Sequence, residues 1–279
     1  MRACVRAMGK RRCLDHPNDH LETCPEAPED RGRAALFRDP NLSGDKMVMM
    51  ASVVPPRIRM WSRAIRDWRN GEPELHILGK LCPPDQIALD IGANCGVYSW
   101  YLRRHARNVI AFEPQPDMAD FLKAAFGSSV QVELVALSDT AGMAKMRIPC
   151  ERYMGGCATI EEENTLSSYK VREISVPMRR LDGYDLGKVG FIKVDVEGHE
   201  LKVLKGAEAV LRRDRPNLLI EAEDRHRPNA VTSVIDYLAP LGYNAYFLKD
   251  ARLRPFSNSE AEKQSGLYNY IFSVRSDLH

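Results

Sequence analysis

The chain has 279 residues, of which 44% are hydrophobic and 28% charged, and its formal net charge is +2. This composition is typical of a globular protein with a sizeable core, and the small net charge gives no reason to expect a nucleic-acid partner. The best candidate for a membrane segment, residues 47–54, is far shorter than the ~20 residues that a spanning helix needs, and the N-terminus lacks the apolar core of a secretory signal. We therefore expect a cytoplasmic protein without a membrane span.

The first 45 residues differ in composition from the rest of the chain. They are rich in Arg, Asp, Glu and Pro and show no steady hydrophobic period, so we expect a disordered extension ahead of a folded domain at 46–279. A zinc site at Cys13, His16, His20 and Cys24 is a less favoured alternative, because their tight, even spacing is unlike that of a zinc finger. The seven cysteines are scattered along the chain, which favours free thiols in a reducing compartment over a disulfide framework.

The folded part begins with an apolar stripe at helical spacing. Ile58, Trp61, Ile65 and Trp68 predict a helix over 58–68 that turns this stripe toward the core. Strands and helices then alternate, which predicts a parallel sheet covered by helices on both faces. The predicted strands are 86–91, 108–112, 130–137, 191–196, 217–222, 243–248 and 268–274, and the predicted helices are 97–105, 116–126, the segment that ends near 212, and 230–238.

Residues 144–186 interrupt the alternation. Two β-like pieces, 144–148 and 171–178, flank a glycine-containing loop at 153–164, and we expect a β-rich insertion near the sheet edge or over the site. Such a loop either carries substrate contacts or is a surface hairpin without a role. Tyr153, Met154 and Tyr169 could bind a ring or a glycan, or simply pack.

The segment LDIGANCG at 89–96 predicts a ligand-binding turn between a strand and a helix. Its glycines, Gly92 and Gly96, follow the pattern D-x-G-x-x-x-G, whereas a dinucleotide site needs G-x-G-x-x-G to bring pyrophosphate to the helix N-terminus. Asp90 suits the ammonium and sulfonium groups of S-adenosylmethionine, and Asn94 can hydrogen-bond its methionyl tail. The turn therefore favours S-adenosylmethionine over NAD.

Two further strand ends fit the rest of that cofactor. Glu113 ends the strand NVIAF and can accept hydrogen bonds from both ribose hydroxyls, although NAD enzymes use the same device. Ser138 and Asp139 follow the next strand, and we expect them near the adenine ring.

The segment FIKVDVEGHE at 191–200 predicts the reacting centre. Asp195 and Glu197 lie at the end of an apolar strand, where uncompensated carboxylates are costly unless they bind something. His199 or Asp195 is the candidate proton acceptor, and Glu200 fits the N-terminus of the next helix. Asp195, Glu221 and Glu223 could together hold Mg²⁺, but we do not favour a metal, because methyl transfer needs little beyond positioning and a base.

The quoted segments together resemble the FkbM family of S-adenosylmethionine-dependent methyltransferases. The specific part is DVEGHE with the downstream LKGA, and the resemblance runs from about residue 72 to about 223. It implies a class I methyltransferase fold, an α/β doubly wound sheet of seven strands with the last strand antiparallel. It also implies O-methylation of a hydroxyl on a sugar, polysaccharide or polyketide-type acceptor, with Asp90, Gly92, Asn94 and Gly96 at the methionyl end, Glu113 on the ribose, and Asp195 to Glu197 facing the reacting centre.

Two other functions remain open from the sequence. The same kind of sheet supports an NAD(P)-dependent oxidoreductase or a non-catalytic cofactor-binding module. The missing G-x-G-x-x-G argues against the first, and the intact acids at 195–200 argue against the second. The sequence gives no information on the oligomeric state or on the identity of the acceptor.

Overall fold

The computed structural model describes residues 54–150, 155–256 and 267–275. The N-terminal extension, its Cys/His cluster, and Tyr153 and Met154 lie outside the described residues. Within the described ranges, no helix is both long enough and apolar enough to cross a membrane.

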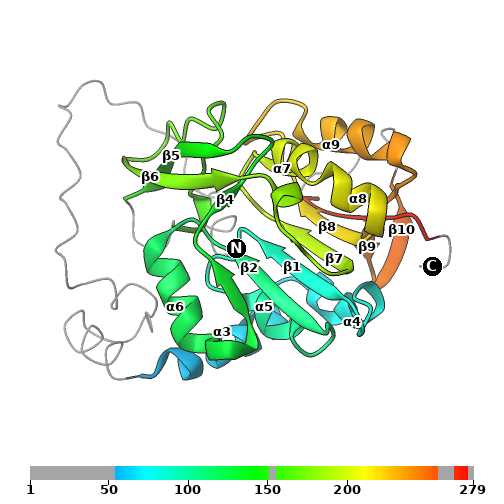
Figure 1. The fold of residues 1–279 in the computed structure, drawn as a ribbon, viewed down its shortest axis with the longest axis horizontal. Helices are drawn as coiled ribbons and strands as arrows, with labels where there is room; N and C mark the ends of the chain where they lie inside the picture. Colours follow the sequence, from blue (N-terminus) through cyan, green and yellow to red (C-terminus); the bar gives the residue numbers. More distant parts are fainter. Residues whose placement is uncertain (1–53, 151–154, 257–266, 276–279) are drawn as a thin grey trace.

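A mostly parallel sheet forms the centre of the molecule (Figure 1). Its strand order is β10-β9-β11-β8-β7-β1-β2-β3, and β11 runs antiparallel to both of its neighbours, as expected. The strands are β1 Ile87–Ile91, β2 Asn108–Phe112, β3 Gln131–Glu133, β7 Val189–Val194, β8 Asn217–Glu221, β9 Asn244–Lys249, β10 Arg252–Pro255 and β11 Asn269–Ser273.

The sheet has eight strands, one more than the seven expected. The extra strand, β10, forms a hairpin with β9. The two turn residues, Asp250 and Ala251, both have positive φ, as a tight two-residue hairpin requires. Neither is glycine and Pro255 ends the strand, so the usual sequence signals of a hairpin are missing.

Helices cover both faces of the sheet. On one face lie α3 Pro56–Asn70, α4 Leu78–Leu81, α5 Val97–Leu102 and α6 Pro116–Phe126, and on the other lie α7 Glu200–Gly206, α8 Glu208–Asp214 and α9 Ala230–Leu238. Successive residues of a strand point to opposite faces of the sheet, so each face has its own hydrophobic core. Ala88 packs with the first group of helices and Leu89 with the second. Short 3-10 helices occupy Pro73–Ile77, Gly127–Ser129, Gly155–Cys157, Leu181–Gly183 and Ala239–Leu241.

The sequence predicted that the apolar stripe of α3 faces the core, but in the structure its first half does not. Ile58 and Trp61 are each 52% exposed, whereas Arg59, Met60 and Ala64 are buried. Arg59 is accommodated because its guanidinium lies over the Phe121 ring, 5.2 Å from the centroid. The prediction of an inward-facing stripe is therefore wrong for its first half.

The predicted strand 130–137 serves two sheets. Its first part is β3 in the large sheet, and its last two residues form β4, Ala136–Leu137. β4 pairs with β6, Val171–Arg179, which pairs with β5, Gly142–Pro149, so the expected β-rich insertion is a separate three-stranded sheet. The long helix expected after β7 is divided at Ala207, where the backbone leaves the helical region between α7 and α8.

The cysteines differ in part from the expectation of free thiols. Cys82 and Cys95 are buried and free, and burial raises the pKa of both thiols. Cys150 is disulfide-bonded, so the expectation is wrong for that residue.

Candidate functional site

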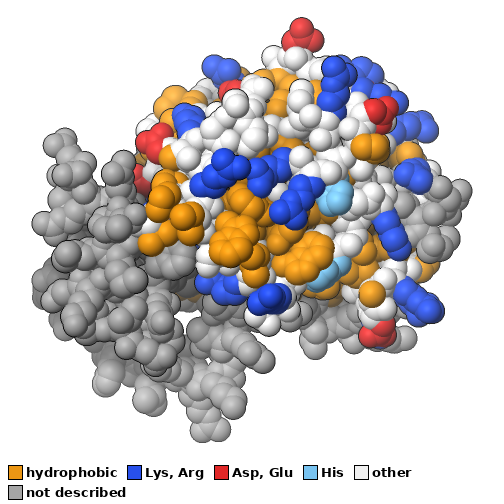
Figure 2. Space-filling view, turned by 90° about the horizontal axis from the view of Figure 1, so that it is seen from below, with side chains coloured by type: hydrophobic (Ala, Val, Ile, Leu, Met, Phe, Trp, Pro, Cys, Tyr) orange, Lys and Arg blue, Asp and Glu red, His pale blue; other side chains and the backbone are white. Residues whose placement is uncertain are grey.

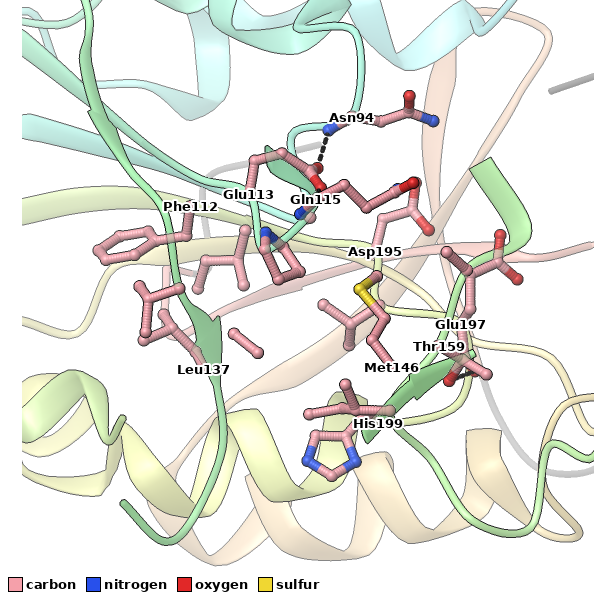
Figure 3. A pocket seen from close by; sticks show the side chains of 18 of the residues that line it. Asn94, Phe112, Glu113, Gln115, Leu137, Met146, Thr159, Asp195, Glu197 and His199 are labelled. Atoms are coloured by element: carbon pink, nitrogen blue, oxygen red, sulfur yellow. Dashed lines mark hydrogen bonds between the residues drawn. The ribbon is translucent and has the colours of Figure 1, made fainter. Parts of the chain in front are cut away.

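A pocket lies at the carboxyl ends of β2, β1 and β7, where ligands bind in sheets of this kind (Figure 3). The insertion closes one side of it with Met146 and residues 158–160. Asn94, Gln115 and Asp195 lie toward one end of the pocket and His199 toward the other. Of the residues predicted for the site, the pocket brings together Gly92, Asn94, Glu113, Asp195, Glu197 and His199.

The glycines of the turn are required by packing against the protein itself. Gly92 has φ +76°, and a Cβ there would lie 1.8 Å from the carbonyl oxygen of Asp195. Gly96 has φ +77°, and its Cβ would lie 2.5 Å from Leu122 on α6. Gly92 lines the pocket and Gly96 does not, so Gly96 serves to seat α5 against α6.

Asp90 does not line the pocket. Its Oδ2 accepts hydrogen bonds from the Ser99 backbone N–H at 2.9 Å and from the Ser99 hydroxyl at 2.6 Å. Burial is the main reason why the pKa of Asp90 is raised. The geometry gives Asp90 the role of holding α5 to the end of β1, with Ser99 as a partner that the sequence analysis did not identify.

Glu113 is fixed in the pocket wall by the backbone. Its two carboxylate oxygens accept hydrogen bonds from the N–H groups of Asn94 at 2.6 Å and Gln115 at 2.9 Å. Burial outweighs these bonds and raises the pKa of Glu113 to about 7. Each oxygen retains a lone pair, so the carboxylate can still accept a bond from a ligand hydroxyl.

A buried lysine holds Asp195. Lys193 Nζ lies 2.7 Å from Asp195 Oδ2 and 4.9 Å from the centroid of the Tyr98 ring, and both charged side chains are almost completely buried. Burial lowers the pKa of Lys193, but the negative charges of Asp195, Asp90 and Glu221 outweigh this effect. The pKa of Lys193 is therefore raised overall, and the ammonium stays charged. The signal for this pair is a lysine two residues before Asp195 in an otherwise apolar strand, which puts both side chains on one face.

Glu197 lies in the strained loop after β7. Its φ is +55°, and its carbonyl oxygen accepts hydrogen bonds from Thr159 at 2.9 Å and Asn164 at 2.8 Å, both in the insertion. Its carboxylate lies 3.0 Å from His226 Nε2. Burial raises the pKa of Glu197, and the neighbouring His226 opposes that shift.

His199 contacts two side chains, one in the insertion and one just after β4. Its Nδ1 lies 2.8 Å from Glu161 Oε2 and its Nε2 lies 2.8 Å from Ser138 Oγ. Burial raises the pKa of Glu161, but the hydrogen bonds and charges of His199 and Lys202 outweigh it and lower the pKa to about 2. Each ring nitrogen of His199 thus already has a hydrogen-bond partner, Glu161 at Nδ1 and Ser138 at Nε2.

Ser138 and Asp139 line a second cavity that shares His199 and Ile160 with the pocket. Its volume is about 480 Å³, and its lining is rich in charged side chains, including Lys145, Arg147, Glu162, Glu173 and Lys202. Glu200 is the first residue of α7, but its Oε1 accepts a hydrogen bond at 2.9 Å from the N–H of Gly198, which precedes the helix, and so it does not cap α7 as expected. Burial raises the pKa of Glu200 to about 7.

The three candidate magnesium ligands do not form one donor set. Both carboxylate oxygens of Glu223 bind Arg225, at 2.7 and 2.6 Å. Glu221 is buried near Asp195 and Lys193, and burial is the main cause that raises its pKa. In the part of the chain that the structure describes, no group of three or more His, Cys, Asp or Glu side chains has the arrangement of a metal site.

The family described as Methyltransferase FkbM domain matches residues 90–245, more than half of the chain. The chain belongs to this family. The resemblance seen in the sequence is therefore confirmed, and so is the α/β fold of a class I methyltransferase with its antiparallel terminal strand, apart from the eighth strand.

Two curated relatives are methyltransferases. The chain is 30% identical over 152 residues to "Hexuronic acid methyltransferase AglP" of Haloferax volcanii, covering 53% of this chain and 61% of that protein. It is 30% identical over 164 residues to "Methyltransferase sdnD" of Sordaria araneosa, covering 45% and 62%. The chain thus spans about three fifths of the length of these relatives.

Solved structures of methyltransferases are similar at low identity. The FkbM methyltransferase of Methylobacillus flagellatus KT is 15% identical with a TM-score of 0.46, covering 84% of this chain and 56% of that chain. The O-methyltransferase of Bacillus cereus in complex with SAH is 10% identical with a TM-score of 0.43, covering 78% and 89%.

Proposed function

We propose that this protein transfers a methyl group from S-adenosylmethionine to a hydroxyl of a sugar-type acceptor. The observation that carries the proposal is the pocket at the strand ends. The strands β2 and β7, which lie on either side of β1, supply Glu113 and Asp195, one carboxylate for a ribose and one beside the reacting centre. Family membership supports methyl transfer, and the hexuronic acid methyltransferase among the relatives supports a sugar acceptor.

The residues present fit the cofactor. Glu113 would accept bonds from the ribose, and Asn94 would hydrogen-bond the methionyl end. Phe112, Val135 and Leu137 form an apolar wall that suits the adenine ring. Ser138 and Asp139, which the sequence analysis assigned to adenine, lie in the second cavity and fit an acceptor better.

The second cavity fits a polar acceptor. It meets the pocket at His199, and its mixture of cationic and anionic side chains offers many hydrogen bonds to a polyhydroxylated molecule. An acceptor bound there would have to extend its hydroxyl past His199 and Ile160 into the pocket to reach Asp195, which lies toward the other end.

For the proton of the attacking hydroxyl we favour Asp195 over His199. Asp195 lines the pocket, and Lys193 binds one of its oxygens and orients the other. His199 would first have to release Ser138 or Glu161. The cofactor supplies an electrophilic methyl group, so the protein must align the acceptor oxygen with it, exclude water and remove one proton.

Calorimetry with S-adenosylhomocysteine and with NADH tests the cofactor, and transfer of labelled methyl to a panel of uronic and neutral sugars tests the acceptor. We expect S-adenosylhomocysteine to bind and NADH not to bind. Asp195→Asn should lower kcat by a factor on the order of 100 or more and His199→Ala should lower it less. Binding of NADH alone would refute the proposal, and equal losses would refute the choice of base.

A further inference from the structure

The outer face of α3 is an exposed apolar strip on a basic helix. Ile58 and Trp61 are each 52% exposed, and Ile65, one turn later on the same side of the helix, is partly exposed. Residues that monomeric proteins bury in a core are here presented to solvent on a well-formed helix of 15 residues. The strip plays no part in the pocket or the second cavity, because no residue of α3 lines either.

Positive charge surrounds this strip. The helix carries five arginines and one acid, Asp67, which pairs with Arg63 and Arg66. Arg103 and Arg104, after α5, add to the same region. Burial lowers the pKa of Arg103, and the positive charges of Arg104 and Arg57 lower it further.

Figure 2 views the molecule from the side on which α3, α4 and α5 lie. Apolar side chains gather at the centre of this face, Lys and Arg surround them, and Asp and Glu are visible only toward the rim. Such a pattern is complementary to a surface that is negatively charged outside and apolar just beneath.

We propose that the outer face of α3, formed by Arg57, Ile58, Trp61, Ile65 and Arg66, binds an anionic lipid surface. A helix lying flat with Trp and Ile at the acyl boundary and Arg among the head groups has the chemistry of an interfacial helix. Tryptophan favours this boundary in particular. A nucleic acid would match the arginines but leave the exposed isoleucine without a partner, so lipid fits more of the face.

The test is co-sedimentation of the full chain with vesicles of phosphatidylcholine alone and of phosphatidylcholine mixed with phosphatidylglycerol. We expect binding to the mixed vesicles, and we expect it to weaken when salt shortens the Debye length from about 10 Å to about 3 Å. The double variant Ile58→Ser/Trp61→Ser should bind at least about tenfold more weakly. Removing an arginine, as in Arg57→Gln, should cost roughly fivefold.

A matched control lies on the three-stranded sheet. Met143→Ser removes another exposed apolar side chain, 64% exposed on β5, and should leave binding unchanged. The wild-type protein gives a second readout, because Trp61 is half-exposed, whereas Trp100 is buried and Trp68 packs partly against the core. Its tryptophan emission should shift to the blue on mixed vesicles, and Trp61→Phe should lose that shift.

Three results would overturn the proposal. They are no binding to mixed vesicles at low salt, unchanged binding of a folded Ile58→Ser/Trp61→Ser variant, and binding to single-stranded DNA with none to vesicles. The proposal does not depend on methyl transfer and can fail or hold by itself.

Discussion

Replacing Lys193 with methionine should destabilise the protein strongly. Methionine has nearly the same length and apolar stem, so the change mainly removes the ammonium that lies 2.7 Å from Asp195 Oδ2. The carboxylate then remains in a nearly closed environment that also contains Asp90 and Glu221. In the wild type the ammonium of Lys193 offsets the negative charges of these carboxylates, and in the variant they would repel one another.

The size of the effect follows from the geometry. At 2.7 Å and an effective dielectric constant of about 20, the attraction is about 6 kcal/mol. Part of this offsets the cost of burying both ions, and removing one partner of a buried pair typically costs about 3–5 kcal/mol. For a chain of this size the melting temperature should fall by roughly 10 °C.

Urea unfolding of wild type, Lys193→Met, Asp195→Asn and the double variant measures the pair directly. The double variant should lose less stability than the sum of the single variants, because it leaves no unpaired charge. The loss in Lys193→Met should also be larger at pH 8 than at pH 5, where protonation of buried carboxyls relieves the repulsion.

Lys145→Met is the matched control. Lys145 faces Glu173 at 3.5 Å, but it is 82% exposed, so its loss should cost less than about 1 kcal/mol. If Lys193→Met were no more destabilised than this control, the view that Lys193 holds Asp195 in place would be refuted.

Three further predictions concern the pocket and its cover. Gly92→Ala should lower stability by about 1–3 kcal/mol in thermal unfolding, because the added Cβ would overlap the backbone carbonyl of Asp195. Gly127→Ala should cost less, because there is open space around its Cβ. Equal losses would contradict the close approach of Gly92 to that carbonyl. Burial raises the pKa of Glu113 to about 7, so this carboxyl contributes stability that is fully present below pH ~4.3 and is lost as the pH rises through about 7. Glu113→Gln should therefore lose less stability than the wild type between pH 5 and pH 8, as measured by urea unfolding. An unchanged dependence of the unfolding free energy on pH would contradict the raised pKa of Glu113. Glu161→Gln weakens the bond to His199 and should speed amide hydrogen exchange over residues 155–166, with no change at β8; uniform exchange across the chain would show instead a global effect.

Local patterns predicted much of the fold. The apolar strands β7 and β8 and the amphipathic α6 and α9 lie where their hydrophobic period placed them, because burial dominates there. The inward stripe of α3 was predicted wrongly, since periodicity reports that a face is apolar and does not report which neighbour covers it. β10 was missed because its turn uses Asp and Ala at positive φ.

The site was predictable at the level of strand ends and less so at the level of partners. Gly92, Asn94, Glu113 and Asp195 meet because parallel strands end at one edge of the sheet. Glu161 and His226 could not be paired with His199 and Glu197 from the sequence, since both contacts depend on how distant loops fold back. The pairing of Lys193 with Asp195 could have been predicted from the sequence, because a lysine in a buried strand requires an anion nearby.

The division of residues 131–137 between two sheets has a consequence for the modularity of the chain. β3 and β4 are separated by two residues, and Ala136 and Leu137 are at once an edge of the small sheet and a wall of the pocket. A graft that exchanges the insertion for that of a relative must carry part of the wall of the proposed cofactor pocket with it. Acceptor preference and cofactor affinity should therefore change together in such chimeras.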